Sequence, residues 1–146
     1  MCQGNSDPDL GDTGYIDAYG YTVSRLDASI LRLVADQYSR GYCILISDAH
    51  GPELHDLDSD QASRFFADLT RASKAIAHAM AADKMNLEIL GNAVPHVHTH
   101  LVPRYYGDSA PGARLLRDHN APATLGHDEY ADIARRIRYA LASGQK

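Results

Sequence analysis

The stretch His96-Val97-His98-Thr99-His100-Leu101-Val102-Pro103-Arg104 places histidines at three alternating positions and decides how the chain is expected to fold around them. Alternate side chains leave the same face of a β-strand, so the segment predicts a strand that carries three imidazoles in one row. The rings would stand roughly 7 Å apart, given a rise of about 3.3 Å per residue. The residues between them would point into a core. Three titratable rings on one strand indicate chemistry rather than packing.

The remaining composition is ordinary for a globular protein and limits the possible functions. The chain has 146 residues, of which 45% are hydrophobic and 23% charged, and this fits a single domain with a proper core. Its formal net charge of −5 argues against binding a nucleic-acid polymer, which depends on clustered Lys and Arg. No apolar run approaches the ~18 residues that span a membrane, and the polar N-terminus does not resemble a signal peptide. We therefore expect a cytoplasmic location without membrane contact.

Local patterns predict an α+β fold built on an antiparallel sheet of about five strands, with one long helix and a C-terminal helix. The expected strands are an edge strand within 15–23 and strands at 29–36, 42–47, 86–90 and 96–102, and the expected helices are 58–82 and 127–142. Asp58 and Gln61 have the spacing of a capping box at the start of the long helix. Residues 1–14 are expected to be a flexible segment, 15–146 to form one domain, and 106–126 to form a long loop.

Three explanations of the histidine row are compatible with the residues themselves. Structural histidines satisfied by one hydrogen bond are common, but three in alternation are not. A metal site would use the H-x-H spacing, yet three rings spread over about 13 Å of strand do not readily share one ion, and no Asp or Glu adjoins the segment. As a nucleophile, a neutral imidazole attacks phosphorus or an acyl carbon through one ring nitrogen while a neighbour accepts the proton on the other. A flanking histidine can then protonate the leaving oxygen.

The segment from Gly91 to Arg104 closely resembles the signature of the histidine triad family of nucleotide hydrolases and nucleotidyl transferases. Residues 83–92 are similar to its bacterial diadenosine-polyphosphate-hydrolase-like branch. Further segments that are similar to the nucleotide-cradling half of the family are Asp36-Gln37, 40–46, His50 and 53–57. The resemblance covers residues 29–104 and implies the family's fold, a homodimer with a sheet continued across the interface, and a nucleotide as substrate.

The resemblance also implies a role for each residue of the site. His98 would be the nucleophile that attacks the α-phosphate of a nucleotide and becomes nucleotidylated. His96 would orient it, partly through its own backbone carbonyl, and His100 would hydrogen-bond the phosphate or the bridging oxygen and assist the leaving group. Asn92 matches a position that contacts the phosphate, and Asp36 matches one that accepts hydrogen bonds from the ribose hydroxyls.

Arginines of the same region are further candidates for binding the substrate. Arg104 is suited to hold a distal phosphate or the leaving group as a bidentate donor, with a surface salt bridge as the alternative. Arg114 and Arg117 in the long loop are candidates to close over a polyphosphate, with solvated surface residues as the alternative. Many relatives have a histidine where this chain has Tyr42, so we expect that part of the wider histidine network to be absent. Zinc-binding relatives use an N-terminal C-x-x-C pair, whereas this chain has only Cys2 there, so no metal is expected.

Together these features predict a nucleotide phosphohydrolase that cleaves a nucleoside 5′-phosphate anhydride or phosphoramidate through a nucleotidyl-His98 intermediate and releases a nucleoside monophosphate. The leaving group would be a nucleotide, as in a dinucleoside polyphosphate such as diadenosine tetraphosphate, or an amine or a sulfate. A third histidine favours hydrolysis, because the related uridylyltransferases carry Gln at that place. No cofactor is expected, apart from a divalent cation that can accompany the polyphosphate. The alternatives are a catalytically weak nucleotide-binding or regulatory module and an H-x-H metal-dependent hydrolase.

Overall fold

A computed structural model of the chain describes residues 16–17 and 20–144. The elements, in chain order, are β1 (Ile16–Asp17), β2 (Gly20–Arg25), β3 (Ser29–Val34), β4 (Cys43–Ser47), the 3₁₀ turn η1 (Leu54–Asp56), α1 (Ser59–Met80), β5 (Lys84–Glu88), β6 (His98–Arg104) and α2 (His127–Ser143). The segment 1–14, for which flexibility is predicted, lies outside the described residues.

The strands form one antiparallel sheet in the order β1-β2-β3-β4-β6-β5. Five strands of five to seven residues make up most of it, and the two-residue β1 extends one edge. Strand β6 lies between β4 and β5, with Ile44 and Glu88 opposite His100 and with Ile46 opposite His98. The predicted α+β fold is therefore confirmed, and the histidine strand is held by a neighbour on each side.

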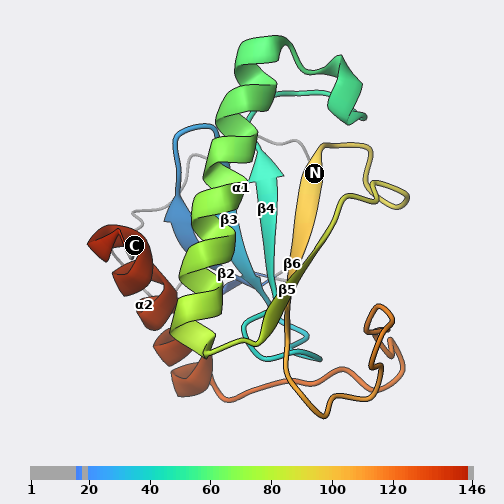
Figure 1. Cartoon of the computed structure of the whole chain (residues 1–146), viewed down its shortest axis with the longest axis vertical. Helices are drawn as coiled ribbons and strands as arrows, with labels where there is room; N and C mark the ends of the chain where they lie inside the picture. Colours follow the sequence, from blue (N-terminus) through green and yellow to red (C-terminus); the bar gives the residue numbers. More distant parts are fainter. Residues whose placement is uncertain (1–15, 18–19, 145–146) are drawn as a thin grey trace.

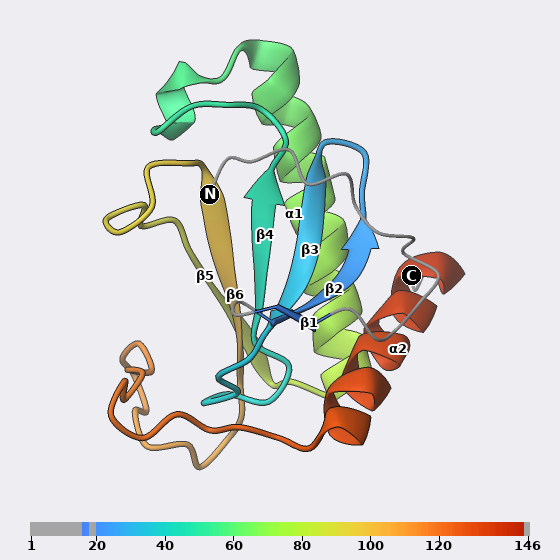
Figure 2. The ribbon, with the colours of Figure 1, turned by 180° about the vertical axis from the view of Figure 1, so that it is seen from behind.

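Both helices lie on the same face of the sheet (Figure 1), and no helix of the described residues covers the other face (Figure 2). Helix α1 packs across β3 to β6, while α2 packs against α1 and β2. The core lies between this helical layer and the sheet, and its largest members are Tyr21, Phe65, Leu31, Leu33, Leu45, Ile76, Leu101, Ile133 and Ile137. We call the two sides of the sheet the core face and the open face.

Helix α1 begins and ends at residues with recognisable caps. Asp58 Oδ1 accepts from Gln61 N at 2.8 Å, and Gln61 Oε1 accepts from Asp58 N at 3.0 Å, which is the predicted capping box. Ala81, with φ of 51°, ends the helix in the left-handed conformation. Apolar residues recur at helical spacing along this helix and are buried, at Phe65, Leu69, Ala72 and Ile76.

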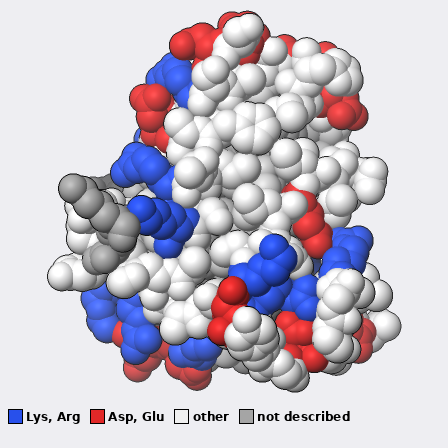
Figure 3. All heavy atoms as spheres, viewed as in Figure 1, with Lys and Arg blue, Asp and Glu red and all other residues white. Residues whose placement is uncertain are grey.

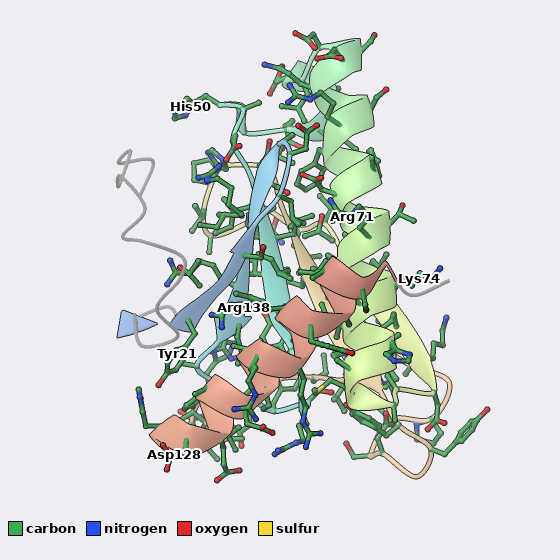
Figure 4. The ribbon with its side chains drawn as sticks, turned by 90° about the vertical axis from the view of Figure 1, so that its left-hand side faces the viewer. Tyr21, His50, Arg71, Lys74, Asp128 and Arg138 are labelled. Carbon is green, nitrogen blue, oxygen red and sulfur yellow. The ribbon has the colours of Figure 1, made fainter. Side chains whose placement is uncertain are left out.

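Side-chain hydrogen bonds join the helices to the first strands. Asp68 of α1 is 2% exposed and accepts from Ala28 N and Ser29 Oγ, each at 2.7 Å, at the turn between β2 and β3. Arg138 of α2 points toward β2 (Figure 4), where its Nε donates to the carbonyl of Val23 at 2.5 Å. These bonds fix the helical layer against the edge of the sheet that lies farthest from the histidines.

Residues 105–126 connect β6 to α2 and contain no helix or strand. The loop passes below the sheet in Figure 1 and is tied to the end of β3, where Gln37 N donates to the carbonyl of Ala123 at 2.8 Å. On the helix-bearing face, side chains of both charges lie next to one another over its lower part rather than forming one extended basic area (Figure 3). Among the described helices, none is long and apolar enough to cross a membrane.

Candidate active site

The three histidines are not in one row, which corrects the simplest interpretation of their spacing. His98 and His100 lie on the open face of β6, with ring centroids 5.1 Å apart and ring planes at 71°. Strand β6 begins at His98, because the residue before it turns toward the loop after β4: Val97 N donates to the carbonyl of Gly51 at 3.0 Å. His96 therefore precedes the strand and is buried beside that loop.

His96 is fixed by contacts with the end of β4. Its Nε2 donates to the carbonyl of Ser47 at 2.6 Å, and its ring meets that of His50 edge to face with centroids 5.6 Å apart. Figure 4 shows His50 in the loop after β4, on the side of the sheet away from α1. Because these contacts fix the His96 side chain, they also restrict its backbone, so the carbonyl of His96 has a defined position. The family resemblance includes His50 without giving it a role, and in the structure its ring contact helps to hold the ring of His96.

The carbonyl of His96 determines which nitrogen of His98 carries the proton. His98 Nδ1 lies 2.7 Å from that oxygen. A carbonyl oxygen only accepts, so Nδ1 donates and the lone pair of the neutral ring is on Nε2. In the part of the chain that the structure describes, this Nε2 has no hydrogen-bond partner. His98 is thus an oriented imidazole with an available lone pair on the open face.

His100 is bonded to a residue that the sequence interpretation left out of the site. The hydroxyl of Tyr42 lies 2.5 Å from His100 Nδ1, and the two rings stack with planes at 18°. Burial, and then the neighbouring His98, hold the pKa of His100 below its usual value of 6.5. No imidazole stands at this position, as the sequence predicts, and the phenol of Tyr42 contacts His100 instead. Tyr42 directly precedes β4 and alternates with Ile44 and Ile46 of that strand, and this alternation in the sequence indicates that the three side chains share a face.

The connection between β3 and β4 sets the position of Tyr42. Gln37 fills this turn, with its Nε2 donating to the carbonyls of Val34 and Tyr42 at 2.7 and 2.9 Å and its Oε1 accepting from Gly41 N at 2.8 Å. Gly41 has φ of 91°, and a Cβ added to it would lie 2.5 Å from Met80 Cγ. Only glycine therefore brings the start of β4 this close to the end of α1.

Asp36 lies at the edge of the site with its carboxylate engaged by the long loop. The residue is 5% exposed, its Oδ2 accepts from Arg117 Nε at 2.6 Å, and its Oδ1 accepts from Ala123 N at 2.9 Å. The predicted ribose contact therefore remains chemically suitable, but ribose hydroxyls would compete with these two donors. The structure places Asp36 as an anchor of the loop in the conformation described.

Arg104 was predicted to hold a phosphate, and the structure corrects this prediction. The residue is 8% exposed, and each of its five N–H groups already donates. Nε and Nη2 donate to Asp108, Nη1 to Asn86 Oδ1 and the carbonyl of Ala113, and Nη2 also to the carbonyl of Ala110, at distances from 2.6 to 2.8 Å. Arg104 thus anchors the start of the long loop, and its guanidinium lowers the pKa of the Asp108 carboxyl to about 2.

The two loop arginines both act electrostatically on His100 and are held by different carboxylates. Arg114 forms a two-point ion pair with Glu88, which is the residue opposite His100 on β5, at 2.7 and 3.2 Å. Arg117 is held by Asp36 as described, and both guanidiniums add to the effect of burial and His98 in lowering the pKa of His100. Their side chains are 54% and 35% exposed, so both remain accessible from solvent. The loop therefore brings positive charge to the His100 end of the site.

Neither the predicted phosphate contact of Asn92 nor a metal site is supported by contacts among the described residues. Asn92 is exposed in the connection between β5 and β6 and makes no hydrogen bond to another described residue. Its predicted phosphate contact stays a prediction. Across residues 16–17 and 20–144, no three His, Cys, Asp or Glu side chains are grouped so that they would hold a metal ion.

Comparison with known proteins agrees with this geometry. A family model described as "HIT domain" matches residues 19–107. The fold is similar to a histidine triad protein from Marinobacter aquaeolei VT8 (TM-score 0.74, 23% identity, 86% of this chain and 91% of that chain). It is also similar to one from Sinorhizobium meliloti 1021 (TM-score 0.73, 22% identity, 83% and 89%). At these identities the structural likeness concerns the fold.

The curated relatives that the chain matches are considerably longer proteins. An imidazoleglycerol-phosphate dehydratase from Chlorobium chlorochromatii is 23% identical over 117 residues, which are 80% of this chain and 56% of that protein. The chain spans about half the length of the curated relatives it matches. Their name therefore carries no activity over to this chain.

Proposed function

The chain belongs to the HIT domain family, and from that premise we propose that it is a cytoplasmic nucleotide phosphohydrolase that works through a nucleotidyl-His98 intermediate. Proteins of this family generally bind or hydrolyse nucleotides. The observation that carries the proposal is the hydrogen bond from His98 Nδ1 to the carbonyl of His96, which leaves the lone pair on Nε2. A nucleophile needs both this lone pair and a fixed ring orientation, and strand β6 fixes the orientation of His98.

The proposed reaction consists of two displacements at one phosphorus atom. First, the lone pair of His98 Nε2 attacks the α-phosphorus of a nucleoside 5′-phosphate anhydride or phosphoramidate, and the leaving group departs with the electrons of the bond that breaks. Water then attacks the same phosphorus, the bond to Nε2 breaks, and a nucleoside monophosphate is released while a proton passes to solvent. His100 assists the leaving group from the adjacent position on the strand. This chemistry requires no resident metal or cofactor.

Substrate binding is proposed to use the groups that surround the two rings. Ile44 and Ile46 are half-buried on the open face beside His100 and His98, and they offer an apolar surface to a base or a ribose. Asp36 is proposed to accept the ribose hydroxyls after exchange with Arg117, and Asn92 to contact the phosphate. The exposed amino groups of the loop arginines suit an anionic distal group such as the second half of a dinucleoside polyphosphate.

Two copies of the chain are proposed to pair along β5, which is the free edge of the sheet on the histidine side. Large apolar side chains are exposed on and just after this strand, where Leu87, Ile89 and Leu90 are 45%, 42% and 47% exposed. An edge strand with exposed apolar residues is a ready surface for pairing with a second strand. Sedimentation equilibrium should give twice the mass of the chain, and a concentration-independent monomer would contradict the pairing.

The decisive experiment detects the covalent intermediate. The protein is mixed with diadenosine tetraphosphate or an adenosine phosphoramidate, quenched within seconds, and analysed by intact mass and peptide mapping. We expect the added mass of one nucleotidyl group on His98, with none in His98→Gln. Nucleotide binding without an adduct or product would instead favour the catalytically weak binding module. Activity that disappears with a chelator and returns with zinc would favour the metal-dependent hydrolase.

A further inference from the structure

The hydrogen bond between Tyr42 and His100 determines the state of His100, just as the carbonyl of His96 determines the state of His98. The phenol of Tyr42 is 3% exposed as a residue, and His100 Nδ1, at 2.5 Å, is its hydrogen-bond partner among the described residues. Of the two possible directions, donation by the phenol satisfies both groups. Donation by His100 would leave the buried phenolic hydrogen without an acceptor, which is costly in a protein interior.

The electrostatic surroundings favour the same arrangement. Burial raises the pKa of Tyr42, so the phenol keeps its proton. The groups that face His100 are His98 on the same strand, Glu88 on β5, Tyr42 before β4, and the loop residues Arg114 and Arg117. Burial, His98 and the two arginines oppose a positive charge on His100, and the carboxylate of Glu88, which favours that charge and is paired with Arg114, does not reverse the lowered pKa. A neutral His100 is therefore the stable form.

We propose that Tyr42 is a positioning residue that holds His100 as a neutral ring with its proton on Nε2, the opposite tautomer to His98. Two histidines on one strand face then present different groups to a substrate: a lone pair from His98 and an N–H from His100. The difference comes from their partners, a carbonyl that only accepts and a buried phenol that donates. This assignment of roles rests on the proposed function, although the tautomer itself does not.

The tautomer limits which leaving groups the site can expel. The neutral N–H of His100 donates a hydrogen bond to the bridging oxygen, but it is a far weaker acid than an imidazolium and does not transfer its proton. When the bond from phosphorus to oxygen breaks, a phosphate or sulfate leaves as a stable oxyanion with the bonding electrons and needs no proton. An amine must gain a proton as it leaves. The structure therefore favours phosphoanhydride or sulfate-linked substrates over phosphoramidates.

The first test measures the tautomer without reference to activity. Long-range ¹⁵N–¹H correlation spectra of the full-length protein at neutral pH distinguish a protonated from an unprotonated ring nitrogen. We expect a protonated Nε2 in His100 and a protonated Nδ1 in His98, and in Tyr42→Phe a mixture of tautomers at His100 alone. Tyr105→Phe is the matched control, since its hydroxyl donates to the carbonyl of Arg40 at 2.6 Å and Tyr105 is not among the groups that shift the pKa of His100. A protonated Nδ1 in wild-type His100 would overturn the proposal even if Tyr42→Phe did not fold.

The second test uses the difference between leaving groups. Loss of one hydrogen bond to a ring of the site should lower kcat for diadenosine tetraphosphate about tenfold in Tyr42→Phe, with KM changed by less than about twofold. For an adenosine phosphoramidate the decrease should be smaller or reversed, because His100 is protonated more readily once the phenol is gone. An equal decrease for both substrates would overturn the proposed role. If the wild-type protein cleaves neither substrate, the proposed function is wrong, and the spectra still decide the tautomer.

Discussion

The two ends of strand β6 carry polar side chains on the same face, but they differ in how many of their hydrogen-bonding atoms already have a partner in the protein. At the N-terminal end, His98 and His100 each use Nδ1 within the protein and have no described partner at Nε2. At the C-terminal end, Arg104 donates from every N–H group it has to Asp108, Asn86 and loop carbonyls. A side chain of suitable chemistry can bind substrate only with atoms that the fold has not already engaged. On the proposed function, the comparison distinguishes a reacting end of the strand, with His98 and His100, from an anchoring end at Arg104.

The largest expected effect is at the reacting end. Replacing His98 by Gln removes the proposed nucleophile, and turnover should fall on the order of 10⁴-fold or more, as when other enzymes lose a covalent nucleophile. Nucleotide affinity measured by calorimetry should change little, because the open face and the loop remain. If His98→Gln released monophosphate at a rate within about tenfold of wild type, another residue would have to make the attack, and the N-terminal end of β6 would not be the reacting end.

The anchoring end should show the opposite pattern. Replacing Arg104 by Gln leaves Asp108 without its guanidinium partner and frees the loop carbonyls, so the melting temperature should fall by several degrees. Turnover per folded molecule should stay within a few-fold of wild type. Arg135→Gln is the matched control, because that arginine is 70% exposed and pairs with Asp132 on the surface of α2. An unchanged melting temperature together with a large rise in KM would return Arg104 to the substrate site.

The smallest expected effect is a pH dependence of stability that comes from His100. Since the folded protein has a lowered pKa there, the unfolded chain takes up its proton first as the pH falls below about 6.5, and the fold loses stability in that range. His100→Gln lacks this proton uptake, so its urea midpoint should decrease less than that of wild type between pH 7 and pH 5. His119→Gln, at an exposed loop position, should follow wild type. Parallel curves for all three proteins would show that His100 is not held neutral by the fold.

Features with local causes could be predicted from the sequence. The capping box of Asp58 and Gln61 lies within one turn, and the helical stripe repeats at the period of the helix, so both are where the sequence places them. The alternation of His98 and His100 likewise indicates their common face. Four of the expected strands follow from the same short-range patterns, with ends that differ from the structure by at most two residues, whereas the strand expected within 15–23 is found as β1 and β2.

Features with distant causes could not be predicted in this way. His96 leaves the row because Gly51 and Ser47, which lie more than forty positions earlier, bind its segment. Tyr42 reaches His100 across 58 positions, and the sequence shows only that a tyrosine stands where relatives have histidine. The partners of Arg104 lie in a loop without periodicity, so its donors could not be counted beforehand. Pattern identifies which residue types are present, whereas the availability of their atoms depends on the assembled structure.

The close approach of Gly41 to Met80 links the last turn of α1 to the position of the Tyr42 phenol. A side chain at position 41 would have to adopt a φ that L-residues rarely take and would contact the Met80 side chain, so we expect the turn that positions the Tyr42 phenol to shift. A bulkier residue at position 80 would press from the other side. A screen for inactive but folded variants should therefore recover substitutions at the end of a helix on the opposite face of the sheet from the histidines. Tolerance to mutation in this protein should therefore depend on the packing beneath Tyr42 as well as on distance from the two rings.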